Sequence, residues 1–147
     1  MAKNDIEDAV KPIQEAWPEI KNEFFKRNPG RYLILSSIYR SPSEQFELFK
    51  KGRTMSTQGD WVVQSQEQVV TNVDGHSILG AHNYMPSRAI DVAIVDNQTG
   101  KTIWEESSYS CLLEIAQGVG LESGLEWKNF KDACHIQVRN YKTYREV

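Results

Sequence analysis

Two histidines and two aspartates lie in two short stretches of the sequence. His82 and Asp91 enclose the stretch HNYMPSRAID, and Asp132 and His135 lie in DACH near the C-terminal end. Two imidazoles and one carboxylate can bind a zinc ion and leave one coordination position open, while a carboxylate outside the ligand set can move a proton. These residue types predict a catalytic zinc site of the kind used by peptidases.

The composition limits the size of the protein and the class of its partners. The 147 residues, 39% of them hydrophobic and 25% charged, are typical of one domain with a core of its own. We predict a single domain over residues 1–147, made of a helical segment at 4–28, a catalytic core at 31–138 and a tail at 139–147. The formal charge of −3 provides no basic surface, so nucleic acid is not an expected partner. We expect a monomer.

Hydropathy and cysteine usage indicate where the protein is made. Residues 1–30 contain no apolar run typical of a signal peptide, and no other stretch is long enough to span a membrane. We therefore expect a cytoplasmic protein without membrane insertion. Cys111 and Cys134 match no CxxC spacing, which favours reduced thiols. A nucleophilic Cys134 beside His135 remains an alternative.

The hydrophobic pattern predicts alternating helices and strands. Apolar residues spaced by three or four from Ile6 to Phe24 predict a helix, kinked or broken near Pro12 or Pro18. Strands are predicted at 31–39, 89–95 and 133–138, with a hairpin turn at 96–100, and a further helix begins near residue 109. The sequence SPSE from residue 41 predicts a helix that starts with a capping box. Residues 53–77 are polar and predict a long loop that could fold over the site.

Two charged residues have unusual positions in these predicted elements. Asp91 is the charged residue within AIDVAIV, and a buried carboxylate requires a bound metal or a salt bridge. Arg40 lies between a predicted strand and a predicted helix, a junction that favours a side chain facing a cleft. An exposed Arg40 in a surface ion pair is an equally acceptable interpretation of its position alone. Gln137 is predicted on the same strand face as His135.

Three blocks in order carry a resemblance to a known family. They are YRSPSEQFELFKKGR at 39–53, VTNVDG followed by HNY and RAIDVAI, and LEWKNFKDACHIQ at 125–137. The chain resembles the zinc D-alanyl-D-alanine carboxypeptidase and L-alanyl-D-glutamate endopeptidase family, particularly its small bacteriophage endolysins. The resemblance implies an α+β fold of the Hedgehog/DD-peptidase type, a small antiparallel sheet with helices packed against it.

The resemblance also assigns roles to individual residues. It implies one Zn²⁺ per chain bound by His82, Asp91 and His135. Asp132 would be the general base that activates the attacking water.

Two further residues would act on the substrate. Arg40 would orient the substrate or polarise its scissile carbonyl. Gln45 matches a motif position near the cleft and is a candidate for substrate binding, although an exposed helix residue fits that position equally well.

The implied activity is hydrolysis of an amide bond in the stem peptide of bacterial peptidoglycan, with L-alanyl-D-glutamate as the expected bond. A D-alanyl-D-alanine carboxypeptidase and a non-catalytic zinc-containing binding module on the same fold are the alternatives. As an endolysin, the protein would stay in the cytoplasm of the infected cell until lysis and then act on the wall.

The sequence departs from the family pattern around the first histidine. The segment from His82 to Asp91 is about two residues longer than usual, with MPS in place of a glycine, and Gly80 replaces a serine. His76, further upstream, is therefore an alternative ligand, although the HNY and RAID flanks favour His82. Cys134 replaces a proline that often precedes the last histidine.

Overall fold

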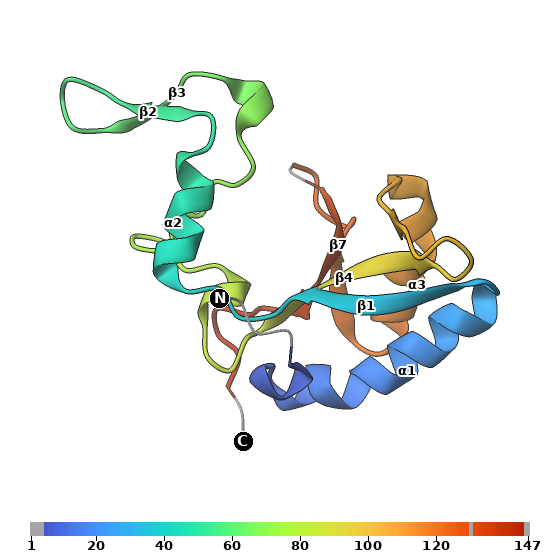
Figure 1. The fold of residues 1–147 in the computed structure, drawn as a ribbon. Coiled ribbons are helices and arrows are strands. Elements are labelled where there is room, and N and C mark those ends of the chain that lie inside the picture. Colours follow the sequence, from blue (N-terminus) through green and yellow to red (C-terminus); the bar gives the residue numbers. More distant parts are fainter. Residues whose placement is uncertain (1–4, 130, 146–147) are drawn as a thin grey trace.

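One antiparallel sheet forms the centre of the fold (Figure 1). The computed structural model describes residues 5–129 and 131–145, so Phe130 of the third motif block lies outside the described residues. Within them, five strands pair in the order β1-β4-β7-β6, with β5 added to β4. Their bounds are β1 Arg31–Ser37, β4 Ala89–Asp96, β5 Thr102–Ile103, β6 Leu121–Gly124 and β7 Asp132–Val138. The α+β prediction is confirmed, while the Hedgehog-type relationship stays a prediction.

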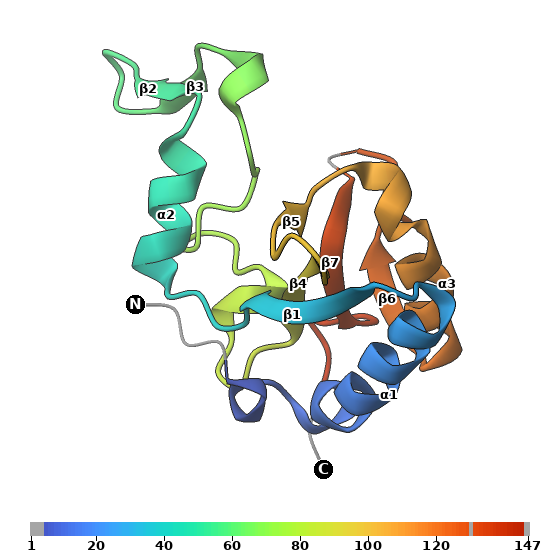
Figure 2. The same cartoon turned by 45° about the vertical axis from the view of Figure 1, so that its right-hand side comes forward.

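Helices α1 Lys11–Arg27 and α3 Ser110–Gly118 pack against this sheet and against one another (Figure 2). Successive side chains of a strand point to opposite faces. Ile90, Val92 and Ile136 accordingly join the hydrophobic core with both helices, whereas Asp91 and His135 alternate with them. The opposite face of the sheet is therefore the one that presents polar groups.

The two prolines of the N-terminal segment have different positions. The 3-10 helix η1 Ile6–Asp8 precedes α1, and Pro12 lies in the first turn of α1, where a missing N–H leaves no helical hydrogen bond unmade. The predicted break is therefore found ahead of Pro12. Pro18 lies inside a continuous helix, so no second break occurs. No helix in the described part of the chain is long and apolar enough to cross a membrane.

Helix α2 Pro42–Lys50 stands apart from the main sheet together with a small hairpin (Figure 1). Its predicted capping box is present, since Glu44 N donates to Ser41 Oγ at 3.1 Å and Ser41 N donates to Glu44 Oε1 at 3.2 Å. The prediction of a continuous loop at 53–77 is wrong in its first half. Strands β2 Arg53–Met55 and β3 Trp61–Val63 pair there, followed by the 3-10 helix η2 Gln66–Gln68. Strands of three residues are too short to show the alternation of apolar and polar residues by which a strand is predicted.

The second half of that segment packs closely against α2. Gly75 has φ +80°, and a Cβ at this position would lie 2.7 Å from the carbonyl oxygen of Pro42 and 2.9 Å from Cβ of Gln45. Only glycine permits both this backbone conformation and this approach. The contact turns residues 69–73 into one wall of a cleft that faces the sheet. The remaining 3-10 helices are η3 Ala81–Asn83 and η4 Glu106–Tyr109.

Candidate metal centre

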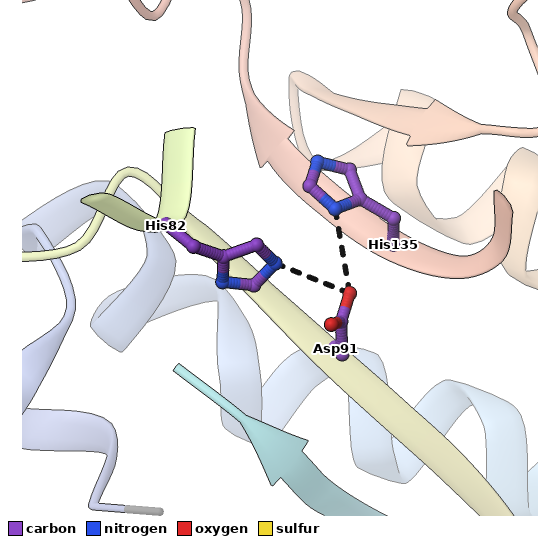
Figure 3. A group of neighbouring side chains, drawn as sticks. All are labelled: His82, Asp91 and His135. Carbon is purple, nitrogen blue, oxygen red and sulfur yellow. Dashed lines mark ion pairs between the residues drawn. The ribbon is translucent and has the colours of Figure 1, made fainter. Parts of the chain in front are cut away.

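His82, Asp91 and His135 come together from three separate elements (Figure 3). Asp91 on β4 and His135 on β7 are direct cross-strand partners, so their side chains share one face of the sheet. His82 lies in η3 and completes the group. His82 Nε2 and His135 Nδ1 each lie 3.3 Å from the same Asp91 Oδ1. The structure thus gathers the three side chains that the sequence predicts as ligands.

A backbone carbonyl fixes the tautomer of His82. Its Nδ1 lies 2.6 Å from the carbonyl oxygen of Ile38. Because a carbonyl only accepts, Nδ1 must carry the proton, and a neutral ring then directs the electron pair of Nε2 at Asp91. The backbone N–H of Arg40 donates to the carbonyl oxygen of His82 at 2.8 Å, which ties η3 to the connection between β1 and α2.

The side-chain amide of Gln137 fixes the tautomer of His135. His135 Nε2 lies 2.7 Å from Oε1 of Gln137, and Gln137 Nε2 donates to Oε2 of Glu122 at 3.2 Å. Since an ionised carboxylate only accepts, this second bond shows which end of the amide faces His135. His135 Nε2 therefore donates to Gln137, and the electron pair of Nδ1 points at Asp91.

The donor set fits a divalent metal ion. Two nitrogen electron pairs directed at one carboxylate oxygen repel its charge unless a cation lies between them. The separation of 3.3 Å is longer than an ordinary N–H···O hydrogen bond. It matches the distance of about 3.3–3.4 Å between ligand atoms that each lie about 2.0–2.1 Å from a tetrahedral zinc. His82 Nε2 and Asp91 Oδ1 are also buried without a hydrogen-bond partner among the described residues.

The electrostatic environment keeps Asp91 ionised. Burial by itself would raise the pKa of this carboxyl, but His82 and His135 outweigh it and hold the pKa well below its ordinary value. Arg40 adds a further cation, with Nη2 3.6 Å from Asp91 Oδ2. Burial would lower the pKa of His135, whereas Asp91 and Gln137 raise it, and the net direction is upward. Among the described residues, Arg40 is thus the permanent cation beside Asp91 Oδ2, while Asp91 Oδ1 faces the two histidines.

Arg40 and Gln45 line the same cleft as the three clustered residues, in a cavity of about 810 Å³. Gln45 is 4% exposed, so the interpretation as an exposed helix residue is wrong. Its Oε1 accepts from Arg40 Nη1 at 3.0 Å, and its Nε2 donates to the carbonyl oxygen of Val73 at 3.0 Å. Gln45 thereby holds the guanidinium of Arg40 against the cleft wall.

Asp132 lies outside the cluster of three and lines the same cleft. It is the first residue of β7 and pairs with Gly124 after a shift in register on β6. A Cβ at Gly124 would collide with the carbonyl oxygen of Asp132, so this close pairing requires glycine. Burial raises the pKa of the Asp132 carboxyl, and the negative charge of Asp91 raises it further. Such a carboxyl can take up a proton more readily than an ordinary aspartate.

The two alternatives raised by the sequence lie elsewhere or lack the required chemistry. The ring of His76 packs against Phe46 with centroids 4.9 Å apart, and His76 is not part of the metal-type cluster found among the described residues. Cys134 and Cys111 are free thiols. Burial, followed by the charge of Asp132, raises the pKa of Cys134 to about 11, which disfavours the thiolate that a nucleophile needs.

Sequence reasoning missed several groups that hold the site. The Trp127 ring lies against His135, with ring centroids 4.8 Å apart, and Glu122 accepts a hydrogen bond from Trp127 Nε1. Asn83 Nδ2 donates to the carbonyl oxygen of Arg40 at 2.8 Å, joining the first and second motif blocks. Asn83 was visible as part of HNY, but its partner lies 43 residues away in sequence.

A curated protein resembles this chain over most of its length. The chain is 32% identical over 120 residues to the peptidoglycan L-alanyl-D-glutamate endopeptidase CwlK of Bacillus subtilis (strain 168). The resemblance to the endopeptidase family is confirmed. The match covers 76% of this chain and 63% of CwlK, so the chain spans less than two thirds of that endopeptidase. No family model matches the chain.

Proposed function

We propose that the chain is a zinc-dependent peptidoglycan peptidase that hydrolyses the bond between L-alanine and D-glutamate in the stem peptide. The observation that carries the proposal is the convergence of His82, Asp91 and His135, whose ligand atoms all lie within 4.8 Å of one another. The bond specificity is supported by the similarity to an endopeptidase that bears this specificity in its name.

Zinc is the metal that this donor set favours. Two imidazole nitrogens and one carboxylate are a frequent protein contribution to catalytic zinc sites, which leave a fourth position for water or substrate. Calcium and magnesium prefer sites made of oxygen atoms, so two imidazole nitrogens disfavour them. The proposed ligand set includes no thiolate, and imidazole nitrogens suit zinc without one. When bound, zinc supplies Lewis acidity, which polarises a carbonyl group and makes water more acidic.

The residues of the chain divide the remaining work. Asp132, with its raised pKa, takes the proton of the attacking water and passes it to the departing amine. Arg40 is held by Gln45 and Asp91 and has further N–H groups that can donate to the oxyanion that develops on the scissile carbonyl. The low exposure of the two histidines keeps their orientation fixed while the substrate binds.

Mass spectrometry of digested peptidoglycan tests the proposed bond. We expect new stem peptides with a free amine on D-glutamate, produced by the zinc-loaded protein and not after treatment with a chelator. Added zinc should restore the cleavage. Release of D-alanine would assign the carboxypeptidase activity instead. No new product from zinc-loaded protein would indicate a non-catalytic zinc-binding module.

The biological role that we propose is that of a bacteriophage endolysin. The proposal is supported by the resemblance of the three sequence blocks to small phage endolysins. In this role the protein would accumulate in the cytoplasm of the infected cell and reach the wall once the membrane has been opened.

Replacing Cys134 with serine separates the metal mechanism from the nucleophilic cysteine that the sequence left open. We expect peptidoglycan hydrolysis to be unchanged, because the raised pKa keeps the thiol protonated. The rate of turbidity loss of a peptidoglycan suspension measures this. A complete loss of hydrolysis in folded Cys134→Ser would contradict the assignment of the reaction to the metal site.

A further inference from the structure

A partly buried polar network lies beside His135 and lines the same cleft. Gln137 is 5% exposed and accepts from His135 Nε2 through its Oε1. Glu122 Oε2 accepts from both Gln137 Nε2 at 3.2 Å and Trp127 Nε1 at 2.9 Å. A single carboxylate oxygen thus holds the two groups that contact the His135 ring.

The register of the sheet creates this network. Glu122 on β6 is the direct cross-strand partner of Gln137 on β7. Gln137 and His135 are two residues apart on the same strand and so point to the same face. The same register pairs His135 with Asp91 on the other neighbouring strand, β4. Two neighbouring cross-strand pairs, joined along β7 by Gln137 and His135, therefore connect Glu122 to the metal-type cluster.

We propose that Gln137 and Glu122 are a positioning pair that imposes the tautomer of His135 needed for metal binding. The inference rests on the proposed zinc site and extends it to two residues of the same cleft wall that lie outside the proposed ligand set. Gln137 accepts the Nε2 proton, so the electron pair of the ring is left on Nδ1. Glu122 keeps the amide of Gln137 in the orientation that makes this possible.

The pair is necessary because the ring of His135 can also adopt the Nδ1–H tautomer, which competes with metal binding. Without an acceptor at Nε2, the proton of the neutral ring can move to Nδ1 and be donated to Asp91 Oδ1, which lies 3.3 Å away. In that tautomer a hydrogen bond would occupy both His135 Nδ1 and Asp91 Oδ1, so neither atom would be free to bind a metal. Holding the proton on Nε2 keeps both groups available.

Gln137 by itself cannot ensure this outcome. The amide group can rotate by 180° and place its NH₂ group against His135. Nε2 would then have to accept a hydrogen bond, so the ring proton would lie on Nδ1. The flip would then point the amide oxygen at Glu122, and a carboxylate facing that oxygen has no proton to donate. The flipped orientation is therefore unfavourable only while Glu122 is present.

Variants of the pair test the proposal by zinc affinity and by the ¹⁵N chemical shifts of His135 in metal-free protein. Gln137→Leu removes the acceptor, and Glu122→Leu releases the amide. We expect each to lower zinc affinity about 10–100-fold, the usual effect of removing such an outer partner, and to populate the Nδ1–H tautomer. The exposed Gln58→Leu serves as the matched control and should change neither property.

An exchange variant, Gln137→Glu combined with Glu122→Gln, provides the rescue. The carboxylate introduced on β7 accepts from His135 and from the NH₂ group introduced on β6. Trp127 Nε1 then has to turn to the oxygen of that amide, because a single oxygen of Glu122 serves both donors in the native protein. Zinc affinity and the Nε2–H tautomer should therefore stay close to those of the native protein. This variant keeps an acceptor for His135 Nε2 on β7 and a polar partner for that acceptor on β6, so it tests the pair even if a leucine variant fails to fold.

Two outcomes would overturn the inference. One is native zinc affinity together with the Nε2–H tautomer in folded Gln137→Leu, and the other is loss of zinc affinity in the folded exchange variant. A native protein that binds no zinc would instead contradict the proposed function. The tautomer of metal-free His135 would still show in that case whether the pair acts on the ring.

Discussion

Asp132→Asn should retain one zinc ion per chain and hydrolyse peptidoglycan about 10²–10⁴-fold more slowly than the native protein, the range associated with a general base. Asparagine has almost the same shape as aspartate but cannot accept the proton of the attacking water. Because Asp132 lies outside the cluster formed by His82, Asp91 and His135, its replacement should not remove a ligand. Zinc content and the rate of product formation are measured on the same preparation.

The control for this variant is the same substitution at an exposed position outside the cleft. Asp60→Asn, next to strand β3, should hydrolyse peptidoglycan at the native rate. Native activity in Asp132→Asn would show that another group is the base. Loss of zinc from Asp132→Asn would mean that Asp132 belongs to the ligand set.

Removal of either histidine ligand should abolish tight zinc binding. Tight structural zinc sites bind with about 10–16 kcal/mol shared among four ligands, or roughly 2.5–4 kcal/mol for each. His82→Ala and His135→Ala should each weaken zinc affinity on the order of 10²–10³-fold. When the zinc concentration is limiting, the rate of peptidoglycan hydrolysis should fall together with the zinc affinity. Competition with a chromophoric chelator gives the affinities.

His76→Ala is the matched control, since it removes the third histidine of the sequence. Its ring packs against Phe46 and lies outside the cluster, so zinc affinity should be unchanged. A variant of His76 that loses zinc while His82→Ala keeps it would support the alternative ligand that the sequence left open and would reject the proposed set.

The local features of the site could be predicted from the sequence. Asp91 stood out as a carboxylate in an apolar strand, and the burial of that strand is what makes a counter-cation necessary. The capping box at Ser41 predicted the start of α2 and, with it, the place of Arg40 at the junction before the helix. These features depend on residues within a few positions of each other, which is the range over which sequence patterns act.

The features that were missed depend on residues far apart in the sequence. The pairing of Glu122 with Gln137 is set by strand register, which no pattern within β6 or β7 specifies. Gln45 occupies a position on α2 that resembles an exposed one, and its burial results from the loop that Gly75 brings against the helix. The hairpin of β2 and β3 was missed because its strands are short.

A crystal structure of the zinc-saturated protein, with anomalous diffraction recorded at the zinc edge, tests the central claim most directly. The expected result is one zinc ion about 2.0–2.2 Å from His82 Nε2, His135 Nδ1 and an oxygen of Asp91, with Asp132 outside its ligand set. A zinc ion bound through His76, through the opposite nitrogen of either ring, or away from β4 and β7 would contradict it.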